Sequence, residues 1–117
     1  DGAKKMIARA ERQKKGGKHH TQARLVRIGD VAFASNNFEL FMDYMHRIQG
    51  RSPFIQTFVV ELSGHNGKDQ HGGYLATERA VKNRGYSATL NQCPVSPQGG
   101  QELVEATVKG LKELYNE

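Results

Sequence analysis

The chain has 117 residues, of which 37% are hydrophobic and 25% charged, and it carries a net charge of +5. This length accommodates one small domain, and the apolar runs fall far short of the roughly 18 residues that a transmembrane helix needs. A single cysteine, Cys93, excludes an internal disulfide framework and a multi-cysteine zinc site.

The positive charge is confined to the start of the chain. Residues 1–20 hold seven Lys or Arg side chains and two acidic ones, whereas residues 21–117 carry ten of each sign. A neutral body offers no extended footprint for phosphates, which argues against nucleic-acid binding. We therefore divide the chain into a basic helical lead segment, residues 1–20, and a folded body, residues 21–117.

The first half of the chain predicts a helix, a hairpin and a second helix. Residues 3–15 have helix-forming composition with a thin apolar stripe. Residues 23–35 contain two β-rich runs joined by Gly29-Asp30, and the second run is apolar on both faces, as an interior strand is. A helix from about residue 38 to residue 49 is predicted next, with Asn36 or Asn37 as its cap and Gly50 as its end. Its apolar face consists of Phe38, Phe41, Met45 and Ile48.

The second half begins with the strongest strand of the sequence, residues 54–62. Residues 63–73 form a polar loop with four glycines, residues 77–83 a short helix, and residues 100–115 a final helix with an apolar stripe. The order strand, helix, strand predicts a βαβ-like crossover. The fold class expected is therefore α/β, with a small mixed sheet and a C-terminal helix.

Two polar residues occupy positions where binding groups occur. Glu39 follows an apolar strand, and ligands of open α/β sheets bind at the carboxyl ends of strands. A glutamate in the first turn of a helix also complements the helix dipole, so Glu39 has a purely structural interpretation too. Tyr74 follows two glycines and is open to the same two interpretations, as a ligand or as a packing residue.

The histidines give a weaker metal signal. His19 and His20 are adjacent in the basic segment, and neighbouring residues rarely converge on one ion. His65 and His71 lie in the glycine-rich loop, which lacks the spacing of a zincin or of a P-loop. That loop is interpreted as a solvated segment or as a binding loop.

A family resemblance rests on the order of several motifs. These are RIGDVAFA at 27–34, Phe38-Glu39, YLATERA at 74–80 and GYSA at 85–88. In this order they resemble the C-terminal part of the catalytic domain of neutral (alkaline, non-lysosomal) ceramidases, and most closely the bacterial ceramidase-like proteins. The resemblance covers residues 22–115. It implies that the chain is one part of a larger catalytic domain and that the protein is secreted or periplasmic.

The same resemblance implies a zinc-dependent hydrolase of amides. The matching positions of two zinc ligands are Glu39 and Tyr74, and Tyr74 is also the catalytic candidate. Thr77, Glu78 and Tyr86 are implied to support the ligands or to orient an amide or lipid-like substrate. Two further histidine ligands belong to earlier parts of the domain, so the segment is expected to be inactive alone and to need the remainder of that domain as its partner.

A second hypothesis comes from the charge alone. The chain is then a stand-alone, non-catalytic α/β module whose basic helix docks on an acidic partner. The two hypotheses differ in what the body of the chain requires, since the first alone needs further segments to complete the fold and the metal site.

Overall fold

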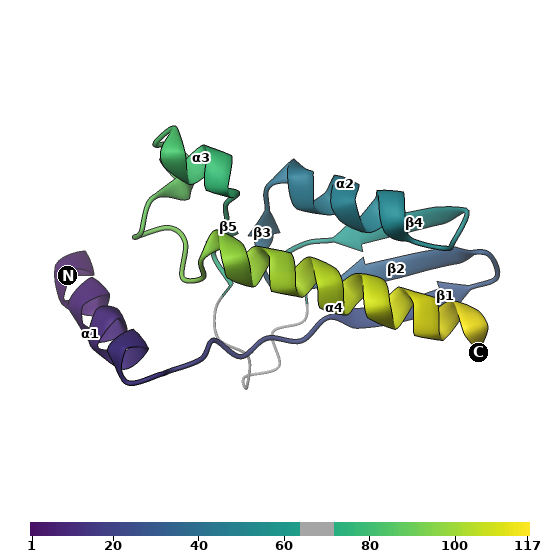
Figure 1. The fold of residues 1–117 in the computed structure, drawn as a ribbon, viewed down its shortest axis with the longest axis horizontal. Coiled ribbons are helices and arrows are strands. Elements are labelled where there is room, and N and C mark those ends of the chain that lie inside the picture. The colour runs from purple at the N-terminus through teal and green to yellow at the C-terminus, as the bar shows by residue number, and fades with distance from the viewer. Residues whose placement is uncertain (64–71) are drawn as a thin grey trace.

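The computed structural model describes residues 1–63 and 72–117. Figure 1 shows a sheet with two helices along it, and a separate helix at the far end of the molecule. Among the described residues, no helix combines the length and apolar character needed to cross a membrane. The elements are α1 (Gly2–Lys14), β1 (Arg24–Ile28), β2 (Val31–Ser35), β3 (Glu39–Leu40), α2 (Met42–Arg51), β4 (Gln56–Val60), β5 (Tyr74–Leu75), α3 (Glu78–Lys82), a 3-10 turn (Tyr86–Ala88) and α4 (Pro97–Asn116).

The main sheet has the strand order β1-β2-β4. β1 and β2 form an antiparallel hairpin in which Ile28 lies opposite Val31, and Gly29 supplies the positive φ of 59° that this two-residue turn requires. β2 and β4 are parallel and are connected through α2. The predicted mixed sheet, the crossover and the central position of the second strand are confirmed.

The core lies between this sheet and two helices, α2 and α4. Ala32 and Ala34 of β2 are buried on the face toward the helices, where small side chains permit a close approach. The largest fully buried side chains come from the two helices and from the β3–β5 region, and are Tyr44, Phe38, Ile48, Leu75, Leu111, Val104 and Val108. The predicted C-terminal helix is confirmed, and it begins three residues earlier than expected, at Pro97, with the Ser96 side chain accepting a hydrogen bond from Gly99 N.

Tyr44 connects the layers through one buried side chain. It is 2% exposed, and its hydroxyl lies 3.0 Å from Ala76 O and 3.1 Å from Pro97 O, so that the two carbonyls share its one proton. α4 passes so close to the ring that a Cβ at Gly100 would come within 3.0 Å of it. One phenol thus joins α2, the end of β5 and the start of α4.

The helix predicted from residue 38 begins later, at Met42. The reason is a strand pairing that local periodicity does not reveal. Glu39 N donates to Gly73 O, and Phe41 N donates to Leu75 O, so this stretch is extended along β5. Asn36 does not cap the helix, because its side chain accepts from Phe38 N instead. Glu39 therefore lies in a strand and not in a first helical turn.

The helix also ends later than predicted. Gly50 lies inside α2, which continues to Arg51. Ser52 has an extended conformation, with φ −68° and ψ 139°. Pro53 follows it, and a residue before proline is sterically disfavoured in the helical region.

The glycines at two helix positions provide a matched test of the Tyr44 packing. Gly100→Ala places a methyl group against the buried Tyr44 ring and should destabilise the fold by about 1–3 kcal/mol. Gly50→Ala meets nothing within 4 Å in the exposed last turn of α2 and should stabilise it by up to about 1 kcal/mol. Urea unfolding of both variants measures the difference, and a neutral Gly100→Ala would contradict the proposed contact.

Candidate functional site

Glu39 and Tyr74 lie directly opposite each other in the short parallel pair of β3 and β5. Neighbouring residues of adjacent strands share one face, so their side chains project side by side. A hydrogen bond to the Glu39 carboxylate raises the pKa of the Tyr74 hydroxyl, whereas a hydrogen bond from Ser87 acts in the opposite direction. The structure therefore brings together two residues that are 35 positions apart in the sequence.

The glycines before Tyr74 explain how the two strands meet. A Cβ at Gly72 would come within 3.0 Å of the backbone of Asn37 and Phe38. Gly73 has a φ of 59°, which places Tyr74 beside Glu39, and Tyr74 N donates to Gln92 O. The pair is thus fixed by backbone contacts on both sides of β5.

A second carboxylate, that of Glu61, lies near Glu39. The chain after β4 continues beside β3, with Leu62 N donating to Phe38 O. Burial raises the pKa of Glu61, and the Glu39 charge raises it further, while a hydrogen bond from the Leu40 backbone lowers it. Sequence reasoning missed this residue, although its place at the carboxyl end of the strongest strand was the available signal.

The other residues implied by the family resemblance lie at different distances from this pair. Tyr86 is 81% exposed and close enough for its charge to raise the pKa of Tyr74. Thr77 is buried, and its side chain caps α3 by accepting from Ala80 N. Glu78 faces another hollow, which it lines together with Tyr44 and Arg47. Tyr86 therefore lies near the Glu39–Tyr74 pair, whereas Thr77 has a structural role.

The side-chain atoms of Glu39, Glu61, Tyr74 and Tyr86 that could bind a metal are all oxygens. Carboxylate and phenol oxygens are hard ligands, and zinc sites normally include nitrogen or sulfur ligands as well. Among residues 1–63 and 72–117, no three His, Cys, Asp or Glu side chains converge on one point. His65 and His71 lie outside the described residues, and the His19 ring packs at a tilt against the Phe38 ring, with centroids 5.5 Å apart. The described part of the chain thus places two oxygen-bearing side chains, Glu39 and Tyr74, next to each other.

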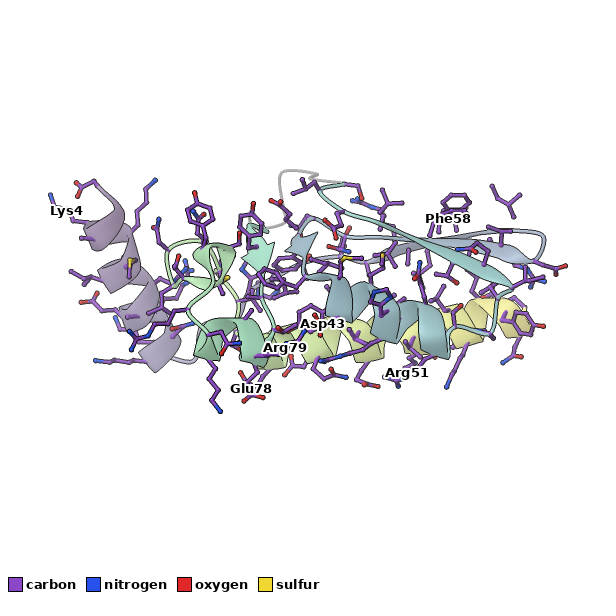
Figure 2. The ribbon with its side chains drawn as sticks, turned by 90° about the horizontal axis from the view of Figure 1, so that it is seen from above. Lys4, Asp43, Arg51, Phe58, Glu78 and Arg79 are labelled. Carbon is purple, nitrogen blue, oxygen red and sulfur yellow. The ribbon has the colours of Figure 1, made fainter. Side chains whose placement is uncertain are left out.

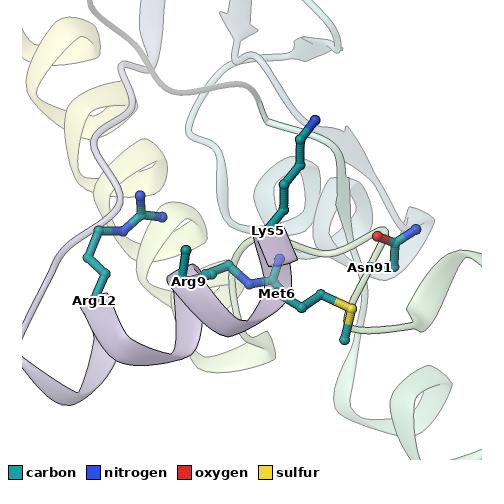
Figure 3. Close-up of a pocket in the computed structure, with 6 residues that line it drawn as sticks. Lys5, Met6, Arg9, Arg12 and Asn91 are labelled. Carbon is teal, nitrogen blue, oxygen red and sulfur yellow. The ribbon is translucent and has the colours of Figure 1, made fainter. Parts of the chain in front are cut away.

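A separate, basic pocket lies beside α1. It has a volume of about 420 Å³, and its lining includes Lys5, Arg9 and Arg12, which project from one stripe of the helix (Figure 3). Arg9 also connects α1 to the segment before α4, because its guanidinium donates hydrogen bonds to Leu90 O and, at 3.2 Å, to Cys93 O. Among the described residues, the lining of this pocket contains no acidic side chain.

Comparison with known proteins assigns no function to the Glu39–Tyr74 pair or to the basic pocket. No family model, curated protein or solved structure matches the chain.

The Tyr74–Glu39 hydrogen bond predicts a specific titration. Because Glu39 raises the pKa of Tyr74, the bond stabilises the fold at neutral pH and is lost as the pH rises through that pKa. Glu39→Gln should move the Tyr74 titration to lower pH, and Glu78→Gln should leave it unchanged. Ultraviolet absorbance titration, with Tyr74→Phe to identify the signal, measures the shift. Equal titrations in both glutamate variants would show that the two side chains do not interact.

Proposed function

We propose that this chain is the C-terminal part of a zinc-dependent amide hydrolase of the neutral ceramidase type, to which it contributes the ligands Glu39 and Tyr74. The supporting observation is their pairing: the two positions singled out by the motifs are opposite residues of adjacent parallel strands and share a hydrogen bond. Motif order alone does not require this proximity. The remaining ligands come from the other part of the domain, so the segment is inactive alone.

Each residue of the cluster has a distinct task in this proposal. A bound zinc would supply Lewis acidity and an activated water for attack on an amide carbonyl. Glu39 provides an anionic oxygen that holds the cation at the end of the strands. Tyr74, supported by Ser87, provides a phenolic oxygen as a ligand or a hydrogen-bond donor to the oxyanion of the tetrahedral intermediate. Tyr86 is exposed beside Tyr74 and orients the substrate, an amide or lipid-like molecule.

Metal content tests this proposal in two proteins. The 117-residue chain should bind zinc weakly at neutral pH, because Tyr74 would have to release its proton with only two oxygen ligands in place. A longer chain with the upstream part of the domain should bind zinc tightly. There, Glu39→Gln or Tyr74→Phe should lower zinc occupancy and amide hydrolysis by at least about 10-fold.

Glu113→Gln and Tyr115→Phe, both in α4, make the same chemical changes away from the pair and serve as controls. Elemental analysis and an amidase assay provide the two measurements. Tight, stoichiometric zinc on the 117-residue chain would contradict the division of the site between two segments, and unaltered zinc content in both ligand variants would contradict the ligand assignment.

The basic pocket supports a second candidate function, the docking of an acidic partner. Three cationic side chains on one helical stripe attract an anionic surface, and residues 21–117 carry no net charge.

Matched double variants test this candidate. Lys5→Gln with Arg12→Gln removes two charges from the pocket, and Lys4→Gln with Lys14→Gln removes two from outside its lining. If the pocket binds, only the first pair should weaken binding to a polyglutamate peptide, by about 10-fold or more at low salt. Equal losses, measured by fluorescence anisotropy, would indicate unspecific attraction to net charge.

A further inference from the structure

The segment between α1 and β1 forms one wall of a cleft beside α4. This segment connects α1, which stands at one end of the molecule (Figure 1 and Figure 2), to the main sheet. Its residues 18–23, which we call the strap, line a cleft of about 550 Å³ together with Phe38 and one face of α4 that includes Leu103. Phe38 is 2% exposed and Leu103 8% exposed, and both belong to the hydrophobic core. The strap therefore lies over the edge of the core.

Two side chains attach the strap to the body. The His19 ring packs against the Phe38 ring, as described above. Thr21 Oγ1 donates a hydrogen bond of 2.7 Å to Asn37 Oδ1. Both partners belong to the stretch that leads into β3. The closed position of the strap thus depends on keeping the His19 ring against an apolar side chain.

The surroundings of His19 suit a neutral imidazole. Its Nε2 atom is buried, and among the described residues it has no hydrogen-bond partner. An imidazolium donates from both ring nitrogens, and a buried N–H of a charged group without an acceptor is far more costly than a neutral nitrogen in the same place. Protonation therefore favours a position of the strap in which Nε2 reaches water.

Most of the charges around His19 also oppose its protonation. Gly17 N donates to Arg12 O, which turns the chain back beside the end of α1. Burial lowers the pKa of His19, and the charges of Arg12 and His20 lower it further. From the two walls of the cleft, Lys18 acts in the same direction and Glu102 of α4 in the opposite one. Among the described residues that surround His19, positive charge thus predominates.

We infer that residues 18–23 form a pH-sensitive strap, which is closed against Phe38 and α4 while His19 is neutral and is released when His19 is protonated. Release uncovers the apolar cleft and leaves the basic helix α1 attached through the hydrogen bonds of Arg9. The inference goes beyond the proposed function, because it involves neither Glu39 nor Tyr74.

The direction of the pH effect follows from proton linkage. The pKa of His19 in the closed strap lies below its ordinary value of 6.5, so the open strap binds the proton more readily. Closure is therefore strongest above about pH 6.5 and weakens as the pH falls below that value. For each pH unit between the two pKa values, protonation lowers the ratio of closed to open strap by about 10-fold.

Nuclear magnetic resonance on the 117-residue chain measures the opening directly. At about pH 7.5, residues 18–23 should have backbone order parameters near about 0.85, and the His19 and Phe38 rings should give mutual cross-peaks. At about pH 5, the order parameters should fall below about 0.6 and the cross-peaks should disappear. Residues 103–111 of α4 should stay rigid at both pH values, which controls for unfolding of the body.

Three variants identify the group that responds. His19→Phe keeps a ring against Phe38 and removes the titration, so the strap should stay rigid at about pH 5. His20→Phe makes the same change at the exposed neighbour and should retain the opening. Thr21→Val removes the hydrogen bond to Asn37, so it should loosen the strap at neutral pH and raise the His19 pKa toward its value in urea.

Four results would overturn the inference. A strap that is rigid at both pH values is not released by protonation, and a strap that is mobile at both is not closed. The same loss of order in His19→Phe as in the unmodified chain would assign the response to another group. Equal pKa values of His19 in the folded chain and in urea would remove the driving force for release.

Discussion

The buried hydroxyl of Tyr44 determines how the site is placed relative to the core. Both of its acceptors are backbone carbonyls: Ala76 O directly follows the two-residue strand β5, and Pro97 O belongs to the first residue of α4. An unsatisfied buried carbonyl costs about 1–3 kcal/mol, so β5 and the start of α4 are held where this phenol can reach them. Burial raises the pKa of Tyr44, which keeps the hydroxyl protonated and able to donate.

This arrangement gives the Glu39–Tyr74 pair a rigid support. β5 has only two residues, Tyr74 and Leu75, and a pair of strands this short has little stability of its own. Leu75 is completely buried, and Ala76 follows with its carbonyl bonded to Tyr44. The alternation of a strand then directs Tyr74 away from the core and toward Glu39. The core side of β5 thus fixes the orientation of the candidate ligand.

Sequence patterns predicted the elements that depend on local chemistry. Gly29-Asp30 located the hairpin, and the stripe of Val104, Val108 and Leu111 located α4. The patterns were wrong where a residue pairs with a distant segment. The apolar spacing of residues 38–41 is helical, but this stretch is extended because it pairs with β5. Motif resemblance singled out Glu39 and Tyr74, because neither residue is distinctive alone, but their pairing across β3 and β5 came from the structure. Glu61 was missed because its proximity to Glu39 depends on the same tertiary pairing.

The hydrogen bond between the two candidate ligands also couples them energetically. The hydrogen bond to the Glu39 carboxylate is the largest cause of the raised pKa of Tyr74, and the Glu39 charge raises that pKa further, so both favour the protonated phenol. If the Glu39 charge is neutralised by a bound cation, that cause disappears and Tyr74 loses its proton more readily. In the proposed zinc site, Glu39 would hold the cation, and Tyr74 would then be better able to act as a ligand. Under the proposed function, the phenol would therefore stay protonated until a cation is bound at Glu39, and would become a second ligand only then.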